Sequence, residues 1–76
     1  MQLPVVNMRR TGERICVLRQ ERGLTVRQLQ RLLGFATPQA IYKWQHGETL
    51  PTIDNLVALS AILNVPISDI LVTEEI

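Results

Sequence analysis

Apolar residues recur at intervals of three and four along most of the 76-residue chain, a spacing typical of amphipathic helices. Threonines stand where helix N-caps are expected, and glycine or asparagine stands where the helical spacing breaks. Together these signals predict five short helices, at about residues 11–22, 26–33, 38–46, 53–63 and 66–71. The predicted caps are Thr11, Thr25, Thr37 and Thr52, and the predicted stops are Gly23, Gly34, Gly47 and Asn64. We therefore expect an all-α fold, a compact five-helix bundle with short connections.

The predicted helix at 38–46 has two chemically different faces. At about 100° per residue, one face carries a polar stripe and the opposite face carries Ala40, Ile41 and Trp44. The polar stripe consists of Gln39, Tyr42, Lys43 and His46. Amide and ammonium groups read base edges in DNA, where Gln pairs with adenine and Lys with guanine. The alternative is an amphipathic helix whose polar face is simply hydrated.

The arrangement of this helix and the one before it favours the DNA interpretation. A short helix, a turn containing Gly34 and a second helix with a polar outer face make a helix-turn-helix. In that unit the first helix crosses the DNA backbone and the second enters the major groove. A helix of about nine residues runs about 13 Å, and an α-helix fits a major groove about 12 Å wide.

The predicted helix at 53–63 is apolar around most of its circumference. Its expected core stripe is Ile53, Leu56, Leu59 and Leu63, and its other side carries Val57, Ala58, Ala61 and Ile62. A helix that is apolar nearly all round is usually buried all round. We therefore expect a homodimer through the fourth and fifth helices. The alternative is that the fifth helix and the chain termini cover this face.

Charge is unevenly distributed, although the net charge is only +1. Residues 1–46 carry all eight basic residues and two acidic ones, a charge of +6. Residues 47–76 carry five acidic residues and no basic one, a charge of −5. This asymmetry suggests that one side faces an anionic partner, with solvated helix faces as the alternative.

Several other classes of protein are disfavoured. A single cysteine, Cys16, excludes an internal disulfide and is consistent with a reducing compartment. No apolar run approaches the roughly 20 residues of a membrane span, and the N-terminus lacks signal-peptide features, so we expect a cytoplasmic protein. His46 has no carboxylate or cysteine at triad or ligand spacing. We therefore expect no catalytic residues, no metal, no cofactor and no enzymatic activity.

The run GLTVRQLQRLLGF, with AIYKWQHGETLPTIDNLVALSAILNV after it, resembles the Cro/repressor-type (XRE-like) helix-turn-helix family. The matching residues are Gly23-Leu24-Thr25, Leu29, Leu33-Gly34, Ile41, Trp44, Gly47, Pro51, Leu56, Leu59, Leu63 and Val65. The resemblance covers about residues 11–71, with the helix-turn-helix at about 25–46. It implies a lambda-repressor-like domain in a prokaryotic or phage transcriptional regulator, such as a repressor, which binds double-stranded DNA as a dimer.

The resemblance also implies roles for single residues. Gln39, Tyr42 and Lys43 fall at positions that read bases. Positions that contact phosphates or orient the helix are occupied by Thr25, Arg27, Gln28, Thr37, Pro38 and His46. An antitoxin or other protein-interaction module with the same fold remains the alternative function, and its main partner would be a protein.

Three residues or segments depart from the family pattern. Val26 replaces a common glutamine and cannot hydrogen-bond a phosphate, so Arg27 or Gln28 must substitute. Gln30 replaces a small alanine, which predicts looser packing of the helices. The turn Gly34-Phe35-Ala36 is one residue longer than usual, which shifts the reading helix.

The chain ends lie outside the predicted helices, as an N-terminal extension (residues 1–10) and a C-terminal tail (residues 72–76). One hypothesis pairs the tail VTEEI with the segment QLPVV as two short strands. Another makes the N-terminus, with Arg9 and Arg10, an arm that follows phosphates. Solvated basic residues before the first helix are the simpler alternative.

Overall fold

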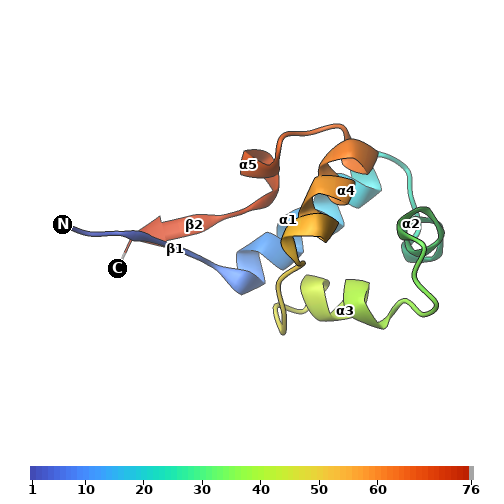
Figure 1. The fold of residues 1–76 in the computed structure, drawn as a ribbon, viewed down its shortest axis with the longest axis horizontal. Helices are drawn as coiled ribbons and strands as arrows, with labels where there is room; N and C mark the ends of the chain where they lie inside the picture. The colour runs from blue at the N-terminus through green and yellow to red at the C-terminus, as the bar shows by residue number, and fades with distance from the viewer. Residues whose placement is uncertain (76) are drawn as a thin grey trace.

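A body of five helices and a two-stranded ribbon that projects from it make up the protein (Figure 1). The computed structural model describes residues 1–75. In chain order the elements are β1 (Pro4–Val6), α1 (Met8–Glu21), α2 (Val26–Leu33), α3 (Gln39–Gln45), α4 (Ile53–Leu63), α5 (Ile67–Ile70) and β2 (Thr73–Glu75). The predicted all-α, five-helix fold is confirmed, and the ribbon adds a small sheet to it.

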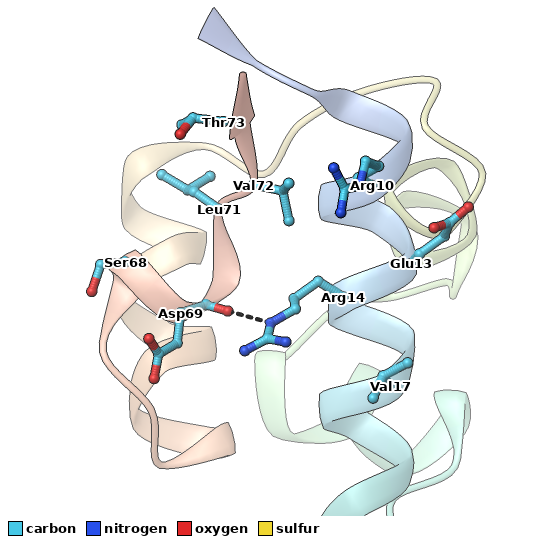
Figure 2. A pocket seen from close by; sticks show the side chains of 9 residues that line it. All are labelled: Arg10, Glu13, Arg14, Val17, Ser68, Asp69, Leu71, Val72 and Thr73. Atoms are coloured by element: carbon cyan, nitrogen blue, oxygen red, sulfur yellow. Dashed lines mark hydrogen bonds between the residues drawn. The ribbon is translucent and has the colours of Figure 1, made fainter. Parts of the chain in front are cut away.

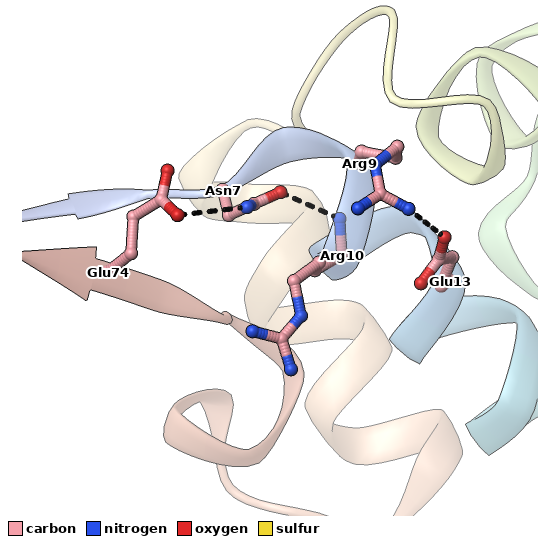
Figure 3. Close-up of polar contacts among 5 residues, drawn as sticks. All are labelled: Asn7, Arg9, Arg10, Glu13 and Glu74. Atoms are coloured by element: carbon pink, nitrogen blue, oxygen red, sulfur yellow. Dashed lines mark hydrogen bonds and ion pairs between the residues drawn. The ribbon is translucent and has the colours of Figure 1, made fainter.

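The first helix begins earlier than predicted. The Asn7 side chain caps it, since Asn7 Oδ1 accepts a hydrogen bond from the Arg10 amide at 2.9 Å (Figure 3). Arg9 and Arg10 therefore belong to the first turn of α1, and Arg9 forms an ion pair with Glu13 at 2.7 Å. The predicted cap at Thr11 is wrong, and so is the hypothesis of an N-terminal arm.

Thr11 instead connects α1 to the segment that leads into β2. The residue is only 1% exposed, and its Oγ1 accepts a hydrogen bond from the Val72 amide at 2.9 Å. The backbone carbonyl of the same residue, Val72, accepts a hydrogen bond from the Asn7 amide at 2.8 Å.

These bonds bring both chain ends together, where β1 and β2 pair as antiparallel strands. The paired residues are Pro4 with Glu75, Val5 with Glu74, and Val6 with Thr73. This confirms the hypothesis of two short terminal strands. Figure 1 shows that the ribbon extends away from the helices.

Buried side chains from all five helices form one core. Its members are Ile15, Leu18, Leu29, Ile41, Trp44, Leu56, Leu59, Leu63 and Ile70. The predicted bounds of α2 and α4 are confirmed, and Thr25 and Thr52 cap them by accepting hydrogen bonds from Gln28 and Asn55 amides. Asn64 ends α4 in the left-handed conformation, with φ of 56°.

The expected core stripe of α4 is wrong at one position, because Ile53 is 75% exposed. At about 100° per residue, Ile53 lies roughly 90° from the centre of the stripe that Leu56, Leu59 and Leu63 form. Pro51, two residues earlier, is buried. Val57, one turn after Ile53, is 55% exposed. Nothing within residues 1–75 covers this apolar face of α4.

Candidate nucleic-acid interface

The third helix presents its polar stripe to solvent. Ile41 and Trp44 are buried in the core, and Trp44 is 3% exposed. The opposite face carries four exposed side chains, those of Gln39, Tyr42, Lys43 and His46. The structure thus brings together the three predicted base-reading residues and His46 on one accessible face.

Two of these side chains also contact each other. The Tyr42 and His46 rings lie with centroids 6.3 Å apart and planes inclined by 22°, an offset stack on successive turns of α3. Tyr42 nevertheless remains 44% exposed. Sequence spacing placed the two residues on one stripe but did not reveal this contact.

The start of α3 differs from the prediction. The helix comprises Gln39–Gln45, and its N-cap residue is Pro38, without any side-chain cap. Thr37 lies one residue outside the cap position, so its predicted capping role is wrong. α3 therefore has 7 residues rather than about nine, and its length is about 10 Å.

The first helix supports α3 from behind at a point of very close approach. A Cβ atom placed on Gly12 would lie 1.9 Å from the Trp44 carbonyl oxygen and 2.9 Å from its carbonyl carbon. Only a residue without a side chain permits α1 and α3 to pack at this distance. Gly12 thus sets the depth at which α3 sits on the body.

Arg19 joins three parts of the interface, a role that the sequence did not reveal. Its Nε donates to Gln45 Oε1 on α3 at 3.1 Å, and its Nη1 donates to the Leu24 carbonyl at 2.7 Å. Leu24 lies in the turn before α2. Arg19 therefore links α1, the entrance to α2 and the last residue of α3. The sequence signal was weak, because Arg19 and Gln45 are 26 positions apart.

The longer turn between α2 and α3 is held by specific contacts. Gly34 ends α2 with φ of 73°, a left-handed conformation that favours glycine. Gln30 binds the turn through both its backbone and its side chain. Its backbone carbonyl accepts a hydrogen bond from the Phe35 amide, and its side-chain Nε2 donates one to the Phe35 carbonyl. The Phe35 ring packs edge-on against Trp44, with centroids 5.8 Å apart. Gln30 thus stabilises the turn between α2 and α3.

The start of α2 carries three of the predicted positioning residues. Thr25 and Gln28 form a reciprocal capping box, in which Thr25 Oγ1 accepts from the Gln28 amide and Gln28 Oε1 accepts from the Thr25 amide. The Gln28 Nε2 group is therefore left for an external acceptor. Arg27 is exposed next to it.

A separate cleft of about 490 Å³ lies between α1 and the segment from α5 to β2 (Figure 2). Arg14 spans it, with Nε donating to the Asp69 carbonyl at 2.7 Å. Two basic residues, Arg10 and Arg14, and two acidic ones, Glu13 and Asp69, line the cleft. Because these charges balance, the cleft has no net preference for an anion.

Residues 1–75 contain neither a cluster of metal ligands nor a helix that could span a membrane. No three side chains among His, Cys, Asp and Glu come together there as a group of metal ligands. None of the helices there has the length and apolar character that crossing a membrane requires.

In this bundle α2 and α3 are joined by a turn, and one face of α3 is exposed. These features place the domain in the class of helix-turn-helix domains. The sequence profile of the family described as "Helix-turn-helix" matches residues 17–70, most of the chain. The chain therefore belongs to the Cro/repressor-type (XRE-like) helix-turn-helix family of DNA-binding regulators.

Solved structures with the same fold include three regulators. The restriction-modification controller protein C.AhdI from Aeromonas hydrophila superposes with a TM-score of 0.74 at 21% identity, covering 83% of this chain and 94% of that one. The DNA-binding domain of BldD has a TM-score of 0.73 at 16% identity, with coverages of 87% and 94%. The clp gene regulator ClgR from C. glutamicum has a TM-score of 0.75 at 16% identity, with coverages of 90% and 86%. The comparison with curated proteins found no match.

Proposed function

We propose that this protein is a sequence-specific transcriptional regulator that inserts α3 into the major groove of double-stranded DNA. One observation carries the proposal, namely that α3 is fixed by Ile41 and Trp44 while its polar stripe stays exposed. An α-helix with its side chains is about 10–12 Å across, so it fits a major groove about 12 Å wide. Family membership supports DNA binding as the class of function.

Three side chains of α3 are proposed to read bases. The Gln39 amide matches the donor and acceptor pair of adenine, and the Lys43 ammonium matches the two acceptors of guanine. Tyr42 offers a ring for a thymine methyl group, with the His46 ring stacked behind it. His46 lies at the end of α3, where we assign it a contact to the DNA backbone.

Contacts at the start of α2 and α3 are proposed to orient the reading helix. Arg27 supplies a charge for a phosphate, and Gln28 supplies the Nε2 group that the capping box leaves unused. Thr25 stabilises this end of α2 through the same box. The Thr37 hydroxyl is not consumed in a cap, so it can donate to a phosphate, and Pro38 fixes the backbone where α3 begins.

Selection from random duplexes, read out by sequencing, tests the proposal and yields the preferred site. On that site Gln39→Ala should cost about 1–3 kcal/mol and relax preference at one base pair. Gln20→Ala is the matched control, because it removes the same side chain from an exposed position of α1. Failure to enrich any sequence, or equal losses by Gln39→Ala on selected and random DNA, would refute the base-reading role.

We also propose that the protein acts as a homodimer through α4 and α5. The supporting observation is the exposed apolar surface around Ile53 and Val57, which a second copy of the chain would cover. Sedimentation at micromolar concentration should give a dimer, and Ile53→Asp should convert it to a monomer. Leu32→Asp, at an exposed apolar residue of α2, should leave the dimer intact. A wild-type monomer at high micromolar concentration would refute the dimer and favour the alternative, in which this surface binds a different protein.

A further inference from the structure

A notch of about 340 Å³ lies between α2 and the turn that leads into α3. One wall belongs to α2 and the other to the turn, with Arg27, Gln30, Arg31, Ala36, Thr37 and Pro38 as the lining residues. Two of these residues are basic and none is acidic. The notch therefore differs from the charge-balanced cleft of Figure 2, since it carries a net positive charge.

The longer turn builds the outer wall of this notch. Gln30 holds the Phe35 carbonyl at 3.2 Å, and Phe35 is further held by the Trp44 ring. The chain then runs through Ala36 and Thr37 before α3 begins at Gln39. The turn of residues 34–38 thus forms the wall that faces α2 across the notch.

The two arginines on the inner wall are free to bind an external group. Arg27 and Arg31 are four residues apart and lie on one face of α2. Both are exposed, and no residue among 1–75 accepts a hydrogen bond from either guanidinium. By contrast, Arg9, Arg14 and Arg19 each donate to a group of the protein. A guanidinium presents a planar fork of donors that matches phosphate oxygens.

We propose that this notch seats one phosphate of the DNA backbone and that Arg31 contacts it together with Arg27. Thr37, whose hydroxyl caps nothing, lines the same notch from the other wall. A phosphate held between both walls fixes the spacing of α2 and α3 and so compensates for the longer turn. Arg31 is thus a positioning residue for the reading helix. This inference rests on the proposed DNA-binding function.

The dependence of affinity on salt tests the phosphate contact directly. Affinity falls as salt rises, and the slope of log affinity against log salt becomes less steep by about 0.9 for each phosphate contact that is lost. When salt is raised from about 50 to about 200 mM, the fold-loss of affinity should therefore be about 3.5 times smaller for Arg31→Ala than for wild type. Its affinity at low salt should fall equally for selected and random DNA, because a phosphate contact carries no sequence information. Arg10→Ala is the matched control, since it removes one exposed arginine from the cleft of Figure 2. Circular dichroism should show that both variants remain folded.

Two further experiments locate the phosphate. Replacement of single phosphates of the selected duplex by neutral methylphosphonates should reveal one position where Arg31→Ala is weakened clearly less than wild type, because Arg27 alone still contacts that phosphate in the variant. Ala36→Asp should weaken binding to all duplexes without loss of the fold, because it places a negative charge in the notch.

The possible outcomes separate this inference from the proposed function. If wild type binds a selected duplex while Arg31→Ala keeps the wild-type salt slope and methylphosphonate pattern, the notch does not bind phosphate and the proposed function stands. If wild type binds no duplex, the proposed function fails, and the inference fails with it.

Discussion

The close approach of α1 and α3 makes Gly12→Ala the most informative change to the fold. Alanine is a better helix former than glycine by about 1 kcal/mol, so helix propensity alone predicts a more stable protein. The structure predicts the opposite. The new Cβ would lie 1.9 Å from the Trp44 carbonyl oxygen, whereas ordinary contacts are about 3.5 Å or longer. Because the obstacle is backbone, no side-chain rotation relieves the contact.

The expected magnitude follows from these two opposing effects. Overpacking costs about 1–3 kcal/mol, and a contact with backbone of a neighbouring helix belongs at the upper end of that range. Subtraction of the helix-propensity gain leaves a net loss of about 2 kcal/mol. For a domain of this size, the melting temperature should fall by about 8–16 °C. DNA affinity should fall as well, because α3 must move away from α1 to accommodate the methyl group.

The assay can use the protein's own fluorescence. Trp44 is the single tryptophan of the chain and lies in the core beside the perturbed contact. Urea titration followed at this residue gives the free energy of unfolding, and Gln20→Ala on the exposed face of α1 serves as the control for the substitution to alanine. A Gly12→Ala variant as stable as wild type, or more stable, would refute the account of how α1 holds α3.

Two further predictions concern the polar contacts around the interface. Gln45→Glu should stabilise the fold by about 0.5–1 kcal/mol, because it gives Arg19 a charged acceptor in place of a neutral one. Thermal unfolding measures this effect, and an unchanged or lower melting temperature would contradict the prediction. Thr25→Ala and Thr52→Ala should each cost about 1 kcal/mol through the loss of an N-cap. In DNA titrations only Thr25→Ala should weaken binding, and equal DNA affinities for the two variants would show that the α2 cap has no part in the interface.

The sequence by itself determined most of the local structure. Threonine caps and glycine or asparagine stops placed α2 and α4 correctly, because these signals act through hydrogen bonds to backbone groups only two or three residues away. The helical period separated the buried Ile41 and Trp44 from the exposed stripe of α3, because a rigid helix fixes which residues share a face. The spacing of these signals over about 60 residues was also sufficient to identify the family.

Only the tertiary structure decided features that depend on residues distant in the chain. Thr11 looks like a cap in the sequence, yet it binds Val72, which lies 61 positions away. Arg19 and Gln45 meet because α1 and α3 cross, and Gly12 is required because they cross closely. The notch beside Arg31 likewise exists only because the turn after α2 folds back beside it. Such contacts leave no periodic trace in a single sequence, since neither partner's position can be calculated until the helices have packed.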